Sequence, residues 1–101
     1  MSDKEYIKTQ LTEEEILTQL AEEAAELSQA ALKMRRSMTD CNPTPKTRGE
    51  CALELTKEVG DVWVCLDLLD NILRPVMEKE VDMGIFMETR ITRWANRLRA
   101  R

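Results

Sequence analysis

Two pairs of acidic residues stand on predicted helices at positions where a helix normally carries apolar side chains. Glu23 and Glu26 lie three residues apart, and so do Glu58 and Asp61; this spacing makes each pair neighbours on one helical face. On a helical wheel, Glu23 and Glu58 fall inside apolar stripes, while Glu26 and Asp61 lie at their edges. A charge so near a packed face is costly unless it is paired or binds a metal. The alternative to a metal site is an ordinary solvated acidic face.

The residue types restrict which metal these carboxylates could hold. The chain of 101 residues contains no histidine, which excludes Cys/His zinc sites, histidine-activated nucleophiles and the Glu-x-x-His pairs of di-iron bundles. Ligation by oxygen alone favours magnesium, manganese or calcium. Four carboxylates in one apolar cleft would repel one another unless divalent cations neutralise them or some are protonated. Magnesium is the economical solution, and substrate phosphates commonly complete its coordination.

The first acidic pair lies on a helix predicted over residues 13–36. This helix begins at a capping box of Thr12 and Glu15, and it ends in basic residues that suit a helix C-terminus. Residues 1–11 are predicted to form an N-terminal arm. The apolar stripe of the helix is predicted to consist of Ile16, Leu20, Ala24, Leu27, Ala31 and Met34.

The second acidic pair lies on a helix predicted to begin at Pro45 or Thr47 and to continue to about Leu73. A capping box of Thr47 and Glu50 starts it, and Pro75 should end it. The proline-containing loop 37–46 is expected to make the two helices antiparallel, which would bring the acidic pairs together. Gly60 lies in the middle of this helix; either it serves close packing or access to a ligand, or the helix simply tolerates a glycine there. The predicted apolar stripe is Leu55, Val59, Val62, Leu66, Leu69 and Leu73.

A last helical region is predicted after Pro75, with an interruption near Gly84. Trp63 and Trp94 have the helical spacing of core or interface residues. The chain is therefore predicted to be all-α, an antiparallel bundle of three main helices and one short one. Its residues 12–101 would form a single domain. Three helices are too few for a closed bundle, so we expect oligomerisation to complete a core like that of a four-helix bundle.

Composition narrows the functional classes. The net charge of −4 and the isoelectric point near 4.9 argue against binding to a nucleic acid polymer. The sequence has no apolar run long enough for a membrane span and no signal peptide. The three cysteines form no CxxC pair and are expected to be reduced thiols of a cytoplasmic protein, with Cys65 in the core.

The acidic motifs together resemble a known family. The sequence EEAAE at 22–26, followed after a loop by EVGD at 58–61, resembles the EExxE…ExxD signature of the MazG-like, all-α nucleoside triphosphate pyrophosphohydrolases. The segments LAEEAAELSQAALKMRR, NPTP and KEVGDVWVCLDLL are similar to those of short, single-domain members from bacteria and phages. The resemblance covers about residues 16–98.

This resemblance implies an activity and a set of site residues. Glu23, Glu26, Glu58 and Asp61 would bind Mg²⁺, with Mn²⁺ as a substitute. The family cleaves nucleoside triphosphates between the α- and β-phosphates, in nucleotide-pool housekeeping. One carboxylate would orient the attacking water, and Glu22 and Glu26 are both candidates for this catalytic role.

The resemblance also implies substrate contacts and an assembly. Relatives often carry a lysine four residues before the tryptophan of the last helix, where this chain has Arg90. Arg93 and Arg97 are further candidates for binding the substrate phosphates. Family members are homodimers or homotetramers, in agreement with the small core expected of a chain of this length.

Two other functions stay open. One is a phosphoribosyl-ATP pyrophosphatase of histidine biosynthesis, which uses similar acidic helices. The NPTP loop and the EExxE spacing favour the nucleoside triphosphate pyrophosphohydrolase over this alternative. The other is a non-catalytic helical interaction module whose carboxylates are structural.

Overall fold

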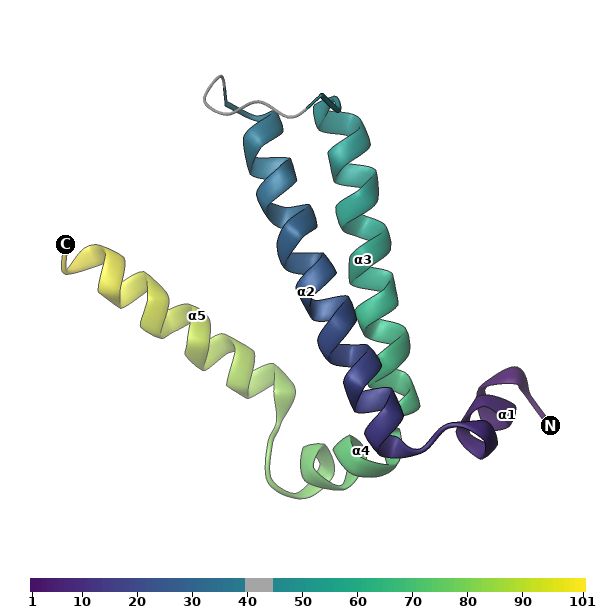
Figure 1. Ribbon diagram of the computed structural model, residues 1–101. Helices are drawn as coiled ribbons and strands as arrows, with labels where there is room; N and C mark the ends of the chain where they lie inside the picture. Colours follow the sequence, from purple (N-terminus) through teal and green to yellow (C-terminus); the bar gives the residue numbers. More distant parts are fainter. Residues whose placement is uncertain (40–44) are drawn as a thin grey trace. The chain divides into compact units, whose positions relative to one another are not determined.

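The protein is described here by a computed structural model that covers residues 1–39 and 45–101, and within these residues all regular structure is helical (Figure 1). The all-α prediction is confirmed for this part of the chain. Cys41 and most of the predicted NPTP loop lie outside the described residues. The chain divides into two compact units, Met1–Leu69 and Asp70–Arg101. The five helices of the described residues are α1 (Asp3–Gln10), α2 (Glu13–Ser37), α3 (Arg48–Leu68), α4 (Asp70–Lys79) and α5 (Met83–Arg99).

The first unit begins with a short helix where the sequence indicated only an arm. The Ser2 hydroxyl accepts a hydrogen bond from the backbone N–H of Glu5, and the Glu5 carboxylate accepts one from Ser2, a reciprocal capping box that starts α1. Lys4 Nζ lies 3.0 Å from Asp67 Oδ1 on α3. This exposed ion pair contributes little energy, but it places α1 near the C-terminal end of α3.

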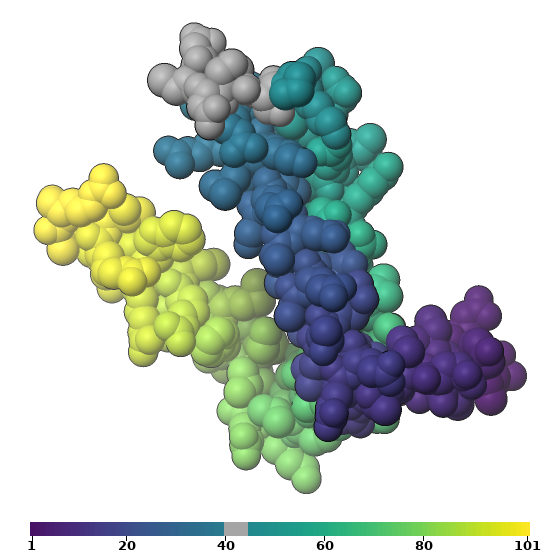
Figure 2. All heavy atoms as spheres, viewed as in Figure 1, coloured from purple at the N-terminus to yellow at the C-terminus, as the bar shows by residue number. Residues whose placement is uncertain are grey.

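Helices α2 and α3 form an antiparallel pair, as predicted, and in the space-filling view they make one continuous packed body (Figures 1 and 2). Both of the predicted capping boxes are present, at Thr12 with Glu15 and at Thr47 with Glu50. Each box satisfies backbone N–H groups that a helix start leaves without an intrahelical partner. Residues close in sequence therefore fix where α2 and α3 begin.

The contact between α2 and α3 follows a heptad-like seam. On each helix the less exposed residues include a set spaced four, three, four, three and four apart, the pattern by which two helices interdigitate. The stripe predicted for α2 is wrong at Ala24 and Ala31, which are exposed, and Ala30 is buried instead. Cys65 is buried in the α3 seam, as predicted. The seam consists of Ile16, Leu20, Glu23, Leu27, Ala30 and Met34 on α2, and of Cys51, Leu55, Glu58, Val62, Cys65 and Leu69 at α3.

The predicted end of the second helix at Pro75 is wrong. The helix ends at Leu68, and Leu69 is its C-cap. The backbone N–H of Leu69 still donates to the carbonyl of Cys65, and the residue is only 2% exposed. Pro75 lies inside α4, where it removes only one hydrogen bond, the one to the carbonyl of Asn71 near the helix start. The break at Leu69 coincides with the boundary between the two units.

The second unit consists of α4 and α5, with an interruption at residues 80–82, just before Gly84. Asp82 caps α5 by accepting a hydrogen bond from the N–H of Ile85. Neither helix has a buried residue. Trp94 on α5 is 63% exposed and Trp63 on α3 is 68% exposed, so neither tryptophan lies in the core of this chain.

Gly60 allows a test of how much a glycine destabilises the interior of α3. A Cβ built at this position would meet nothing within 4 Å, so no described residue requires a glycine there. We expect Gly60→Ala to raise the free energy of unfolding by roughly 0.5–1 kcal/mol, because glycine weakens a helix interior by about that amount relative to alanine. Urea denaturation followed by circular dichroism measures the change.

The reciprocal substitution Ala25→Gly, at an exposed position of α2, is the control and should lower stability by a similar amount. A loss of stability in Gly60→Ala would contradict the expectation and would show that another chain packs against this side of α3.

Candidate functional site

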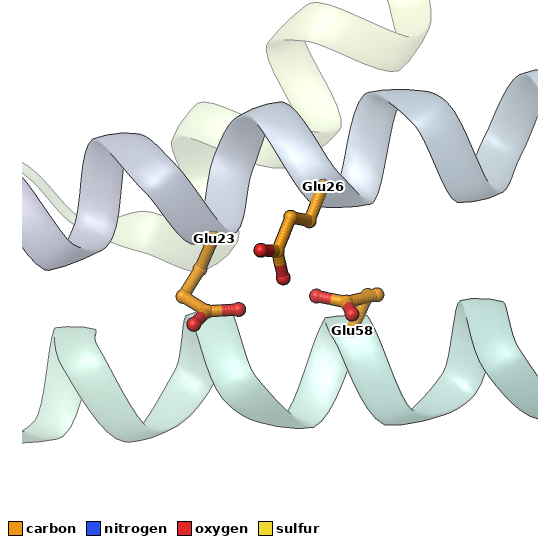
Figure 3. Close-up of side chains that lie close together, drawn as sticks. All are labelled: Glu23, Glu26 and Glu58. Carbon is orange, nitrogen blue, oxygen red and sulfur yellow. The ribbon is translucent and has the colours of Figure 1, made fainter.

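The α2–α3 seam brings together three of the four predicted ligands. Glu23 and Glu58 occupy seam positions and are half-buried, whereas Glu26 lies beside the seam and is exposed. Figure 3 shows the three side chains reaching from the two helices into the space between them. One carboxylate oxygen from each residue lies within 4.8 Å of one from each of the other two. The antiparallel register of the two helices therefore creates a carboxylate cluster, here defined as Glu23, Glu26 and Glu58.

Two oxygens of this cluster are buried without a hydrogen-bond partner. They are Oε2 of Glu23 and Oε2 of Glu58. The other oxygen of Glu23, Oε1, accepts a hydrogen bond of 2.8 Å from Gln19 Nε2. A buried carboxylate oxygen without a partner is unfavourable. Both helices thus direct a carboxylate oxygen without a hydrogen-bond donor into the space between α2 and α3.

The electrostatics of the cluster agree with its geometry. Burial raises the pKa of the Glu58 carboxyl most. The negative charge of Glu26, a hydrogen bond with Glu23 that only the protonated form of the pair can make, and the charges of Glu23 and Asp61 raise it further. The environment thus opposes the charged form of Glu58. A cation at the cluster would reverse this effect, because it interacts favourably with the ionised form.

The donor set fits a hard divalent cation. Magnesium lies about 2.0–2.1 Å from its oxygen ligands, so two ligands of one ion are at most about 4.2 Å apart. The separations in the cluster, all within 4.8 Å, require only small side-chain adjustments to meet this limit. Cys65 is a poor competitor as a ligand, because burial and the charges of Glu23 and Asp61 raise the pKa of its thiol.

The remaining predicted residues lie outside the cluster. Asp61 is exposed and acts on Glu58 through its charge, and Glu22 is exposed on α2. The three candidate arginines, Arg90, Arg93 and Arg97, are exposed on α5, in the second unit. The guanidinium carbon of Arg90 lies 4.8 Å from the centre of the Phe86 ring, a cation–π contact.

An open cleft adjoins the cluster, and the sequence alone did not indicate it. Its volume is about 380 Å³. Two members of the cluster, Glu26 and Glu58, form part of its wall, and two lysines, Lys33 and Lys57, line it as well. The signal in the sequence is the spacing: Lys33 follows Glu26 by seven residues, two helical turns, and Lys57 directly precedes Glu58. The other lining residues are Gln29, Ala30 and Glu54.

Comparison of the chain with protein-family models, with curated proteins and with solved structures found no match. None of the helices in the described part of the chain combines the length and the apolar character needed to cross a membrane.

The raised pKa of Glu58 predicts a pH effect in the metal-free protein. Because the folded state holds this proton more tightly than the unfolded state, the contribution of Glu58 to stability is greatest below its unfolded pKa. That contribution is lost as the pH rises through the higher folded pKa. We therefore expect Glu58→Gln, measured in EDTA, to gain thermal stability relative to the native chain as the pH rises from 4 to 8.

Glu22→Gln is the matched control, since Glu22 is exposed on α2; its stability should run parallel to that of the native chain over the same pH range. If Glu58→Gln also ran parallel to the native chain, desolvation of Glu58 would be negligible and the cluster would be an ordinary solvated acidic face.

Proposed function

We propose that the protein is a Mg²⁺-dependent nucleotide pyrophosphohydrolase of the MazG-like type. It would cleave a ribo- or deoxyribonucleoside triphosphate between the α- and β-phosphates, giving the monophosphate and pyrophosphate, in cytoplasmic nucleotide-pool housekeeping. The observation that carries the proposal is the pair of buried, unpartnered oxygens on Glu23 and Glu58, within a cluster that includes Glu26. These three residues occupy motif positions of the EExxE…ExxD signature.

Each residue of the site has a proposed role. Glu23, Glu26 and Glu58 hold the ion, and Asp61 is the further ligand expected from the signature. A bound Mg²⁺ would neutralise charge on the phosphate oxygens and lower the pKa of a water. Between the two candidates for orienting the water, we favour Glu26 over Glu22, because Glu26 belongs to the cluster and lines the cleft. Arg90, Arg93 and Arg97 remain predicted phosphate ligands.

The activity is tested by release of pyrophosphate from a panel of canonical and modified nucleoside triphosphates. With added pyrophosphatase, malachite green detects the phosphate that forms; without it, a true pyrophosphohydrolase gives little signal. We expect turnover with Mg²⁺ and none in EDTA. Glu23→Gln and Glu58→Gln should each lower kcat/KM by about a hundredfold or more, since loss of even an outer-shell partner of a metal ligand costs about 10–100-fold.

Glu88→Gln, an exposed glutamate of α5, is the control and should retain full activity. Unchanged turnover in Glu58→Gln would show that the assigned metal site is wrong. Pyrophosphate release from phosphoribosyl-ATP alone would favour the histidine-biosynthesis alternative. An absence of cleavage across the whole panel would leave the interaction module as the better description.

We propose further that the chain assembles as a homodimer or homotetramer. The buried apolar residues among those described all belong to the first unit, and α5 carries an apolar stripe without a buried member. Large exposed apolar side chains in a row are typical of a surface that another chain covers. The stripe consists of Met87, Ile91, Trp94 and Leu98, each at least half exposed.

The assembly is tested at Ile91, in the middle of this stripe. Ile91→Glu would bury a charge in the proposed interface, so light scattering after size-exclusion chromatography should show a lower mass than for the native chain. Thr92→Glu, one residue along and on the other side of α5, should leave the assembly intact. A native chain that runs as a monomer at all concentrations would contradict the proposal.

A further inference from the structure

We propose that Lys33 and Lys57 form a phosphate subsite in the cleft beside the carboxylate cluster, which binds the β- and γ-phosphates of the substrate. This inference rests on the proposed function and extends it, because it says where the leaving pyrophosphate lies. The two lysines come from opposite walls of the cleft, one from α2 and one from α3. Neither occupies a position of the acidic signature.

The helix geometry directs both lysines towards the middle of the cleft. Side chains on a helix lean towards its N-terminus. Lys33 therefore leans towards Glu26, which lies seven residues earlier on α2. Lys57 leans towards the N-terminus of α3 and so away from Glu58. Because α3 runs antiparallel to α2, this direction is opposite to that of Lys33. Seven residues of helix rise about 10.5 Å, so the ammonium groups are expected to approach each other between the level of Lys33 and the cluster.

The lysines keep their positive charge available for a ligand. Glu54, the other acid in the wall of the cleft, has its own cation, since it forms an ion pair with Lys46. The hydrogen bond from Lys46 lowers the pKa of Glu54 and so favours its ionised form. Within the described residues, no ion pair joins Lys33 or Lys57 to a carboxylate. Lys33 acts on Glu54 through its charge, but neither lysine forms an ion pair in the described part of the chain, so both ammonium groups can contact an anion.

Charges of opposite sign are therefore separated along one cleft. The end formed by Glu26 and Glu58 suits a cation, and the part lined by Lys33 and Lys57 suits an anion. A magnesium-bound polyphosphate carries both features in one molecule: a metal ion that carboxylates can hold, and terminal phosphates that ammonium groups can bind.

This placement gives the reaction a direction. The oxygen of water bonds to the α-phosphorus, and the bond from that phosphorus to the oxygen bridging to the β-phosphorus breaks. The bridging oxygen leaves with pyrophosphate, and the proton of the water passes to a carboxylate and then to solvent. Lys33 and Lys57 would stabilise the negative charge that develops on the leaving pyrophosphate. The two lysines should therefore bind free pyrophosphate as well as the triphosphate.

The experiment measures binding of pyrophosphate in the presence of Mg²⁺ by isothermal titration calorimetry. Lys33→Met and Lys57→Met keep the side-chain length and remove the charge, and each should weaken binding by about tenfold, the loss of one charge-assisted hydrogen bond. Lys33→Arg and Lys57→Arg should retain most of the affinity. Lys79→Met, at the end of α4 and outside the cleft, is the control and should bind pyrophosphate like the native chain.

The outcomes separate this inference from the proposed function. If the native chain cleaves nucleotides but neither methionine variant weakens pyrophosphate binding, the lysines belong to a solvated helix face; the subsite is then wrong while the function stands. If no nucleotide is cleaved and pyrophosphate still binds in a lysine-dependent way, the anion site stands and the function is wrong. A native chain that does not bind pyrophosphate overturns the subsite.

Discussion

The antiparallel packing of α2 against α3 is the interaction on which the rest of the described structure depends. Its seam contains the buried residues of the first unit, and the same seam holds Glu23 and Glu58. Seam positions normally carry apolar side chains, so two glutamates there weaken the packing that positions them. A ligand that neutralises both would reinforce the pair of helices. Stability and binding of such a ligand would therefore be coupled at one place in the fold.

The cleft beside the seam illustrates how two helices can build a polar site without a loop. Glu26 and Lys33 lie along one wall, two turns apart on α2. Lys57 and Glu58 lie along the other wall, next to each other on α3. Because a helix holds its side chains at a fixed rise and rotation, the order of charges along the cleft follows from the register of the pair. A shift of one helical turn would separate Glu26 from Glu58.

The second unit has a different physical character. Helix α5 carries the apolar stripe Met87, Ile91, Trp94 and Leu98, yet none of these residues is buried in this chain. An amphipathic helix gains most of its stability by packing its apolar face. The proposed assembly would supply such packing, and it would cover Trp94, which is exposed in the chain alone.

Periodicity and capping in the sequence determined the helical class, the starts of α2 and α3, and the unusual positions of Glu23 and Glu58, because these features depend on neighbours within a few residues. Only the tertiary structure decided that Ala30 rather than Ala31 is buried, and that the second long helix is interrupted at Leu69 rather than at Pro75. It also decided that Asp61 lies outside the carboxylate cluster. The cleft with Lys33 and Lys57 also appeared only there. These features depend on the rotation and register of one helix against another, and residues far apart in the chain set both.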